Sequence, residues 1–377
     1  MENILITGGA GFIGSNLALA LLKRGYPVRV MDALSPQIHG DNPESSPLFL
    51  SIKDKVEFVF GDVRKREDWE KAIEGQDIIV HLAAETGTGQ SMYEVEKYVD
   101  VNIKGTAILL DLLANKQHKV KKVVVASSRA IYGEGRYDCE MHGEVFPEER
   151  LDSLMSKEMF NLQCPYCSGV LNLKATHEQS KIHPTSIYGI TKQNQEQMVL
   201  VGCKSLNIPA VAFRYQNVYG PGQSLSNPYT GILSIFSTRI LNGNPINIFE
   251  DGKESRDFVY IDDVVSATIL GIEKEESNNQ VFNVGTGVNI SVLHVVESLM
   301  KHYKKEVNID VSGNYRLGDI RHNYADLEKI NKLLGYTPSI TFDEGVSRFT
   351  KWVESQEVQR DSYNESIEEM KKKGLFK

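Results

Sequence analysis

A glycine-rich turn directly after the first apolar segment constrains the fold more than any other feature of this sequence. Residues 4–7 form a short apolar run, which is typical of a buried parallel strand. Three glycines follow within residues 8–14 at intervals of three, and residues 15–24 then show the apolar spacing of a helix. Glycines let a pyrophosphate approach the helix N-terminus, because side chains would block it. The order of strand, glycine turn and helix therefore predicts a dinucleotide-binding loop.

An acidic residue at the end of the next strand indicates which dinucleotide to expect. Residues 28–31 form a second apolar strand, and Asp32 follows it. A carboxylate at this place binds the ribose hydroxyls of adenosine and repels a 2′-phosphate, so we expect NAD rather than NADP. A glycine triplet alone is also compatible with a plain tight turn. The pattern is far more specific when a strand, the glycines, a helix, a second strand and an Asp follow one another within about 30 residues.

Strand and helix patterns continue to alternate along the chain, as a sheet with helices on both faces requires. We therefore expect an α/β fold built on a Rossmann-type doubly wound parallel sheet. Residues 34–51 are expected to form a surface loop, which either covers the adenosine or has no ligand role. His81 is expected to be a packed residue of the fold. The expected strands are 56–60, 77–84 and 122–128, and the expected helices are 68–74 and 99–115.

Composition and charge exclude several classes of protein. With 41% hydrophobic and 24% charged residues, the chain has the balance of a globular protein rather than a disordered one. The net charge of −8 argues against binding to nucleic acid or an anionic membrane. No apolar run approaches the roughly 20 residues that cross a bilayer, and the first residues lack the basic start of a secretory signal. Four cysteines are too few for a disulfide scaffold, so we expect a cytoplasmic location.

A tyrosine and a lysine four residues apart suggest acid–base chemistry. Tyr188 and Lys192 would share one face of a helix. A free phenol has a pKa near 10, and a neighbouring cation lowers it by favouring the phenolate. Ser128, at the end of the expected strand 122–128, would supply a hydroxyl that orients a substrate alcohol. The Tyr–Lys spacing alone has little meaning, but it follows the glycine turn and the serine strand in a consistent order.

These motifs together resemble the extended short-chain dehydrogenase/reductase family, which includes nucleotide-sugar epimerases and dehydratases. The glycine spacing at 8–14, the S-S-x-x-x-Y-G sequence at 127–133 and the Y-x-x-x-K sequence at 188–192 carry the resemblance. It implies a catalytic triad of Ser128, Tyr188 and Lys192, and family members usually form homodimers through helices such as 100–115 and 188–206. The implied NAD contacts are Gly8, Gly11, Phe12, Ile13, Gly14, Asp32, Asp62, Val63, Leu82, Ala83, Ala84, Asn102, Tyr188 and Lys192.

The second half of the chain resembles the part of this family that binds the nucleotide-diphosphate sugar. Residues 213–222 resemble R-Y-F-N-V-Y-G-P, with Gln216 in place of the usual Phe. Arginines suit a diphosphate because the guanidinium binds paired oxygens; a surface ion pair is the alternative for each. The implied substrate contacts are Gln90, Ser91, Ser128, Asn217, Arg256, Arg316 and Asp319. The expected parts are a dinucleotide-binding domain (1–216, with 256–274 returning to it), a Cys-rich insertion (137–183), a smaller C-terminal α/β substrate lobe (217–353) and a polar tail, helical or frayed (354–377).

One departure from the family bears on the reaction. Dehydratases of the family carry Asp and Glu after the position of Ser128, whereas this chain has Arg129 and Ala130. Without these carboxylates we expect 4-epimerisation by transient oxidation at C4. Residues 90–94, 98–102, 226–231 and 248–252 resemble the branch of the family that interconverts dTDP-L-rhamnose and dTDP-6-deoxy-L-talose.

Other functions remain open from the sequence. UDP-sugar 4-epimerases, on glucose or glucuronate, share the same blocks of sequence. Arg129 would be the cation for a glucuronate carboxylate, unless it lies on the surface. A net 4-dehydrogenase and a non-catalytic NAD-binding sensor are the further alternatives.

The insertion at 137–183 contains three of the four cysteines in two short motifs. Cys139 and His142 form C-x-x-H, and Cys164 and Cys167 form C-P-x-C. This spacing predicts a zinc-ribbon-like site with one structural zinc, because all four positions of the tetrahedron come from the protein. Free thiols and a redox C-x-x-C are the alternatives, and His177 and His183 are substitute ligands. Cys203 is expected to be a packed thiol.

Overall fold

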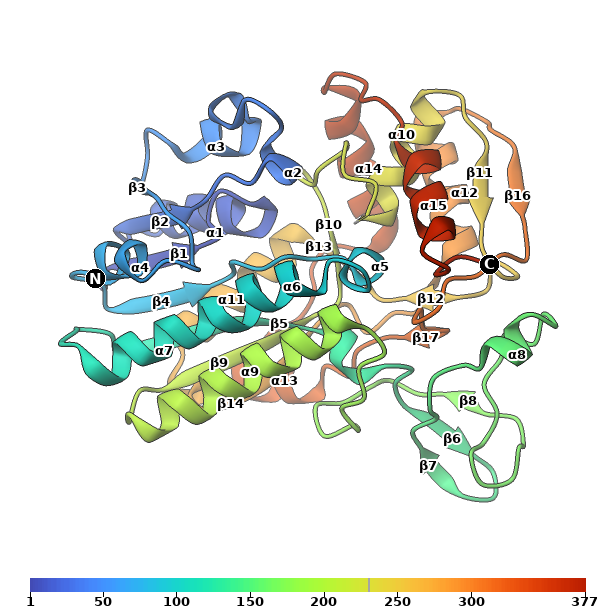
Figure 1. The fold of residues 1–377 in the computed structure, drawn as a ribbon, viewed down its shortest axis with the longest axis horizontal. Coiled ribbons are helices and arrows are strands. Elements are labelled where there is room, and N and C mark those ends of the chain that lie inside the picture. The colour runs from blue at the N-terminus through green and yellow to red at the C-terminus, as the bar shows by residue number, and fades with distance from the viewer. Residues whose placement is uncertain (230) are drawn as a thin grey trace.

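The computed structural model describes residues 1–229 and 231–377, so Thr230 of the 226–231 segment lies outside the described residues. Its centre is a sheet of seven parallel strands in the order β14-β9-β5-β4-β1-β2-β3 (Figure 1). The predicted doubly wound parallel sheet is confirmed. Its strands are β1 (Ile4–Thr7), β2 (Val28–Asp32), β3 (Glu57–Phe60), β4 (Ile78–His81), β5 (Lys122–Ser128), β9 (Ala210–Tyr215) and β14 (Gln280–Val284).

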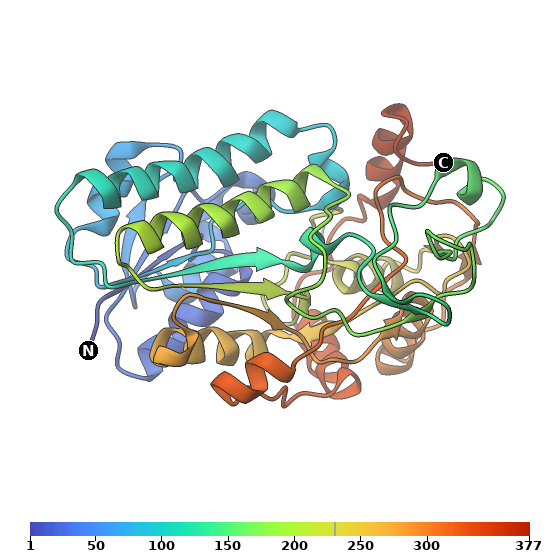
Figure 2. The same ribbon diagram turned by 90° about the horizontal axis from the view of Figure 1, so that it is seen from below.

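Helices cover both faces of the sheet, as Figure 2 shows from below. One face carries α4 (Arg66–Ile73), α7 (Gly105–Asn115) and α9 (Ile187–Ser205). The other carries α1 (Phe12–Lys23), α11 (Ile261–Glu273) and α13 (Glu328–Leu334). Alternate side chains of each strand enter opposite cores: Ile4 and Ile6 pack with Leu17, whereas Leu5 packs with Trp69. Burial on both faces explains why these strands read as continuous apolar runs.

Two expected elements differ in detail. The proposed loop at 34–51 contains α2 (Pro36–His39), a 3₁₀ turn (Pro43–Ser45) and α3 (Pro47–Ile52). Each starts with a proline, whose fixed φ suits the first turn of a helix. The expected helix at 99–115 begins as a π-helical segment, Val99–Lys104, before α7.

The chain leaves the sheet after β9 and builds a smaller lobe from short strands and helices. The paired strands are β10 (Asn217–Tyr219) with β13 (Phe258–Tyr260), β11 (Ile246–Ile248) with β16 (Ile309–Val311), and β12 (Ser255–Arg256) with β15 (Ile290–Ser291) and β17 (His322–Asn323). The main helices are α10 (Ile232–Leu241), α12 (Val292–Tyr303) and α14 (Phe342–Glu354). Between these segments, α11 and β14 return to the large sheet.

The last residues form an ordered part of this lobe. Helix α15 (Tyr363–Lys372) buries Ile367 and Met370 against a cluster that also contains Phe376. Residues 375–377 then pair with 315–317 through backbone hydrogen bonds of 2.9–3.0 Å. The sequence left open whether residues 354–377 form a helix or a frayed end, and the structure shows a helix.

The insertion lies outside the large sheet and the helices that cover it, at the lower right of Figure 1. It consists of an antiparallel sheet of β7 (Gly143–Val145), β6 (Tyr137–Cys139) and β8 (Asn172–Leu173), with α8 (Asp152–Met155) between β7 and β8. Across the described part of the chain, no helix is both long and apolar enough to cross a membrane.

Candidate active site

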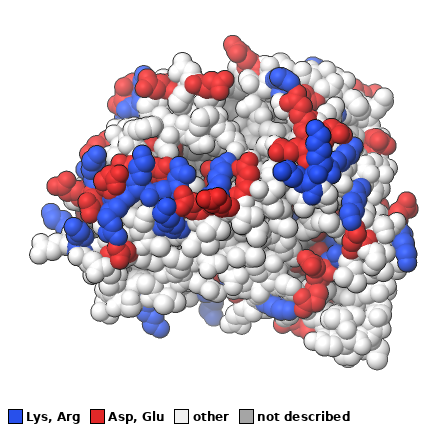
Figure 3. All heavy atoms as spheres, in the orientation of Figure 1, with Lys and Arg blue, Asp and Glu red and all other residues white. Residues whose placement is uncertain are grey.

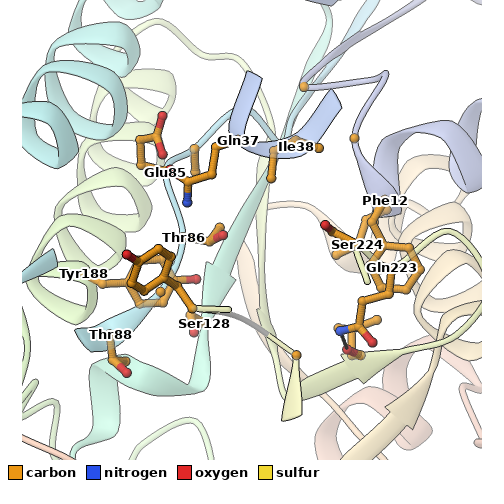
Figure 4. Close-up of a pocket in the computed structure, with 18 of the residues that line it drawn as sticks. Phe12, Gln37, Ile38, Glu85, Thr86, Thr88, Ser128, Tyr188, Gln223 and Ser224 are labelled. Carbon is orange, nitrogen blue, oxygen red and sulfur yellow. Dashed lines mark hydrogen bonds between the residues drawn. The ribbon is translucent and has the colours of Figure 1, made fainter. Parts of the chain in front are cut away.

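A cavity of about 950 Å³ runs from the glycine turn to the smaller lobe. It opens at the carboxyl ends of the parallel strands, where the chain reverses its strand order between β1 and β4. Figure 4 shows Tyr188 beside Ser128 on one side and Phe12 with Gln223 and Ser224 across from them. One cavity therefore joins the expected cofactor contacts to the expected substrate contacts.

The glycine turn is packed too closely for any side chain. A Cβ on Gly14 would lie 2.3 Å from the carbonyl oxygen of Gly8, and a Cβ on Gly8 would lie 2.8 Å from the backbone of Ala83. Gly8 also has a φ of +66°. Helix α1 begins at Phe12 without a capping side chain, so its first N–H groups are available to an anion. This cradle fits the pyrophosphate of a dinucleotide.

Asp32 connects the second strand to this turn. Its carboxylate accepts hydrogen bonds from the backbone N–H groups of Ala10 and Leu34, both at 2.9 Å. Burial raises the pKa of Asp32, and these hydrogen bonds oppose the shift. Most of the expected cofactor contacts line the cavity: Gly8, Gly11, Phe12, Ile13, Gly14, Asp32, Asp62, Val63, Leu82, Ala83, Ala84, Tyr188 and Lys192.

Asn102 lies behind the cavity wall. It accepts a hydrogen bond from the backbone N–H of Glu85 at 2.8 Å and donates to Thr191 at 2.9 Å. Asn102 therefore connects the strand end after β4 to helix α9.

Ser128 and Tyr188 meet where β5 ends and α9 begins. Ser186 caps α9 by accepting a hydrogen bond from the N–H of Gly189 at 3.1 Å. A Cβ on Gly189 would lie 2.6 Å from the carbonyl oxygen of Ala130, so glycine permits the helix to approach this strand end. Burial raises the pKa of Tyr188, whereas its hydrogen bond with Ser128 and the charge of Arg129 lower it.

Lys192 lies one turn further along α9 and is fully within the protein. Burial lowers the pKa of Lys192 to about 7, and its Nζ donates to Gln195 Oε1 at 2.6 Å. Arg129 is a half-buried residue of the cavity wall, so a position on the outer surface is wrong for it. Its Nε donates to Asn217 Oδ1 at 2.7 Å, and burial lowers its pKa to about 9.

The expected diphosphate contacts form one wall of the cavity. Arg316 pairs with Asp319 at 2.7 Å, and Arg256 donates to the carbonyl oxygens of Ile320 at 2.6 Å and Arg321 at 3.0 Å. Among the residues that the structure describes, Arg256 has no carboxylate within ion-pair distance. Ser128, Asn217, Arg256, Arg316 and Asp319 line the cavity together.

Gln90 and Ser91 lie outside the cavity lining and support it. Gln90 accepts a hydrogen bond from Gln37 at 2.9 Å, and Ser91 accepts from the backbone N–H of Tyr188 at 3.0 Å. Gln216, which replaces the usual Phe, lines the cavity with both amide atoms buried and unpaired. Among the residues that the structure describes, these two atoms have no hydrogen-bond partner.

Other cavity residues come from segments to which no motif was assigned. Helix α15 contributes four of them: Tyr363, Ser366, Ile367 and Met370. They occupy positions i, i+3, i+4 and i+7, which is the spacing of one helix face. Glu250 lies in the 248–252 segment, which was singled out for its resemblance to the family. The structure shows in addition that it belongs to a buried charge cluster with Glu134, Arg150 and Arg321, whose ion pairs no local sequence pattern encodes.

The insertion brings its four candidate ligands together. His142 Nδ1 lies 3.6 Å from the sulfurs of both Cys139 and Cys164, and the sulfurs of Cys139 and Cys167 lie 3.7 Å apart. All four ligand atoms lie within 4.8 Å of one another. Cys203 is a buried residue of α9 whose thiol pKa is raised to about 12 by burial.

Comparison with known proteins agrees with this site. Residues 4–285 match the NAD dependent epimerase/dehydratase family. The chain is 35% identical over 361 residues to dTDP-L-rhamnose 4-epimerase of Burkholderia thailandensis, covering 95% of this chain and 96% of that one. It is 29% identical over 357 residues to a putative UDP-glucose 4-epimerase of Methanocaldococcus jannaschii, covering 93% and 98%.

Two solved structures share the fold over nearly the whole chain. UDP-glucuronic acid 4-epimerase from Bacillus cereus, in complex with UDP-glucuronic acid and NAD, matches with a TM-score of 0.76 and 27% identity, covering 94% of this chain and 99% of that one. UDP-glucose 4-epimerase of Thermotoga maritima, with UDP-glucose, matches with a TM-score of 0.74 and 29% identity, covering 94% and 99%.

Proposed function

Because the chain belongs to the NAD-dependent epimerase/dehydratase family, we propose that it is an NAD-dependent nucleotide-sugar 4-epimerase whose substrate is dTDP-L-rhamnose. The observation that carries the reaction type is the pair of Ser128 and Tyr188 in the cavity, followed by Arg129 and Ala130 instead of carboxylates. The identity to a dTDP-L-rhamnose 4-epimerase supports the choice of substrate.

In this proposal Tyr188 is the acid–base residue. NAD, when bound, accepts a hydride from C4 of the sugar and returns it, so that the cofactor ends the cycle unchanged. Tyr188, as phenolate, takes the proton of the C4 hydroxyl and later returns it. Ser128 holds the C4 oxygen by a hydrogen bond. The positive charge of Arg129 favours the phenolate in a site where burial opposes it. Lys192, one turn further along α9, is proposed to add to this effect when it is charged.

The same residues argue against loss of water from the sugar. Elimination needs a group that protonates the leaving hydroxyl and a base for the neighbouring carbon. Beside Ser128 the chain offers the guanidinium of Arg129, which remains protonated, and the methyl group of Ala130. In this proposal a ketone formed at C4 is therefore reduced again, from either face, and does not lose water.

A second substrate is favoured by a specific observation. Arg129 faces the cavity, and within the described residues 1–229 and 231–377 it donates only its Nε, to Asn217, which leaves its terminal nitrogens for an anionic group on the sugar. A glucuronate carboxylate is such a group, and a solved UDP-glucuronic acid 4-epimerase shares the fold. UDP-glucuronate is therefore the second candidate, and UDP-glucose the third.

We also propose that the insertion holds one structural zinc on Cys139, His142, Cys164 and Cys167. Tetrahedral zinc with bonds of about 2.3 Å to sulfur places its sulfur ligands about 3.8 Å apart. The sulfurs of Cys139 and Cys167 lie 3.7 Å apart, which supports this geometry. With four protein ligands, the metal would have a structural and not a catalytic role. Metal analysis of the purified protein should give one zinc per chain, and Cys139→Ser should lose it.

The assay that tests the reaction follows each candidate sugar by NMR and NADH by absorbance. A C4 epimer of dTDP-L-rhamnose without net NADH is the expected result. NADH accumulating with a keto-sugar would make the protein a dehydrogenase. Turnover of UDP-glucuronate or UDP-glucose alone would replace the proposed substrate, and binding of NAD without turnover of any of them would favour a sensor.

A further inference from the structure

The insertion reaches the wall of the substrate cavity through one buried side chain. Arg150 lies among the 21 residues between His142 and Cys164, and its side chain is 4% exposed. Its guanidinium donates to Glu134 at 3.1 Å, to Glu250 at 2.7 Å and to the backbone carbonyl of Asp319 at 2.8 Å. A residue of the insertion is therefore bonded to two residues that line the cavity, Glu250 and Asp319.

The turn at 316–321 is held from two sides. Arg150 binds the carbonyl oxygen of Asp319, and Arg256 binds the carbonyl oxygens of the next two residues. The same turn presents the guanidinium of Arg316, which is fixed by its ion pair with Asp319. The position of this arginine in the cavity therefore depends on contacts that the insertion completes.

Other residues of the same segment hold the turn and Tyr315, the residue before it. Asn161 accepts a hydrogen bond from Arg321 Nε at 3.2 Å. Phe160 packs in a buried cluster with Tyr315, whose hydroxyl donates to Asp152 at 2.7 Å. Together with Arg150 these contacts involve residues before, within and after α8, so residues 150–161 of the insertion are attached to this wall.

The Cys/His motifs lie at the two ends of that segment. His142 precedes it and Cys164 follows it, and the two ligand atoms are 3.6 Å apart. A metal bound to both motifs closes the segment into a loop, which reduces the conformational entropy that its ordering costs. Loss of the metal would let the segment move and withdraw Arg150 from the wall.

We infer that the metal-held insertion is part of the nucleotide-sugar site, with Arg150 as a positioning residue for the 316–321 turn. The inference rests on the proposed function, since the turn is assigned to the diphosphate of the substrate. It assigns to the metal an effect on substrate affinity in addition to local stability.

Binding of dTDP and of UDP, measured by calorimetry on the full-length protein, tests the role of Arg150 without turnover. Arg150→Met should weaken nucleotide binding by about tenfold or more, and Arg150→Lys by less, because lysine keeps the charge but not the three directed contacts. NAD content should stay equal to the wild type, which shows that the fold is intact. Lys181→Ala is the matched control, because Lys181 forms an exposed ion pair with Glu148 in the same insertion.

The metal is tested by combining variants. Cys164→Ser should raise KM for the sugar with little change in kcat, and adding Arg150→Met should raise it no further, because both changes release the same turn. Three results would overturn the inference. They are an unchanged nucleotide affinity in Arg150→Met, additive increases of KM in the double variant, and a purified wild type that contains no metal. Failure of the wild type to bind dTDP or UDP would instead overturn the proposed function.

Discussion

At the scale of single residues, the proposed chemistry depends on a phenol in a buried site. Burial raises the pKa of Tyr188, and only directed neighbours oppose it. The sequence predicted Lys192 as that neighbour from its spacing, whereas in the structure the charge that lowers the pKa of Tyr188 is that of Arg129, which follows Ser128 along the chain. The ammonium group of Lys192 donates to Gln195. The spacing rule could not identify Arg129, because this contact arises between a strand end and a helix far apart in sequence.

Replacing Tyr188 by Phe should lower turnover by about 10²–10⁴-fold, the usual contribution of a general acid–base group. NAD should remain bound, because the ring and the glycine turn are unchanged. The measurement is the epimerisation rate together with the NAD released on denaturation. Tyr26→Phe is a matched control, since its hydroxyl contacts Glu273 and not the cavity. A Tyr188→Phe enzyme with wild-type rate would contradict the assignment.

Because of His81, we expect the free energy of unfolding to decrease at acid pH. Its imidazole is buried between Thr7 at 2.8 Å and Thr106 at 3.0 Å, and burial lowers its pKa to about 3. Between pH 6.5 and 3 the unfolded chain binds this proton and the folded chain does not. The free energy of unfolding should therefore fall by about 2 kcal/mol from pH 7 to pH 5 on account of His81. Urea titrations of wild type and His81→Gln should show a flatter pH dependence in the variant; equal slopes would disprove the role.

At the scale of elements, the unit of β1, glycine turn, α1 and β2 was the most predictable part of the molecule. Its signals are local, because the apolar strand, the glycines and Asp32 all lie within one short stretch. Helix α15 was far less predictable. Its contribution to the cavity wall depends on residues 375–377 pairing with 315–317, a contact across the lobe that no local pattern encodes.

Gly14→Ala should disrupt cofactor binding more than folding. The added Cβ would lie 2.3 Å from the carbonyl oxygen of Gly8, so the turn must open where the pyrophosphate would approach α1. We expect NAD affinity to fall about tenfold or more, which corresponds to about 1.4 kcal/mol. Titration with NAD after removal of bound cofactor gives the measurement. Lys23→Ala, at the exposed end of the same helix, should bind NAD as the wild type does. Binding of NAD by Gly14→Ala with wild-type affinity would contradict the role of the glycine turn as the pyrophosphate site.

At the scale of the whole molecule, we propose a homodimer through α7 and α9. In Figure 3 the face over α9 is largely free of charged side chains. Ile190 and Val201 are exposed on that helix, Val201 to 70%. An exposed apolar face on a helix whose other side packs on the sheet is typical of an interface.

Val201→Glu should convert this dimer to a monomer of 42.3 kDa, because it places a charge on the exposed apolar face of α9. Light scattering after gel filtration measures the mass. Val288→Glu, at an exposed position of the smaller lobe, should leave the dimer intact. A monomeric wild type, or a dimeric Val201→Glu variant, would contradict the proposal.

The order of elements along the chain limits how this protein can be recombined with its relatives. After β9 the chain enters the smaller lobe, returns through α11 and β14 to complete the large sheet, and then enters the lobe again. A single crossover after residue 216 would thus exchange the edge strand β14 and two of the covering helices, α11 and α13, along with the lobe. A chimaera that changes only sugar preference has to graft at least two separate segments, 217–260 and the part after 284, into one recipient.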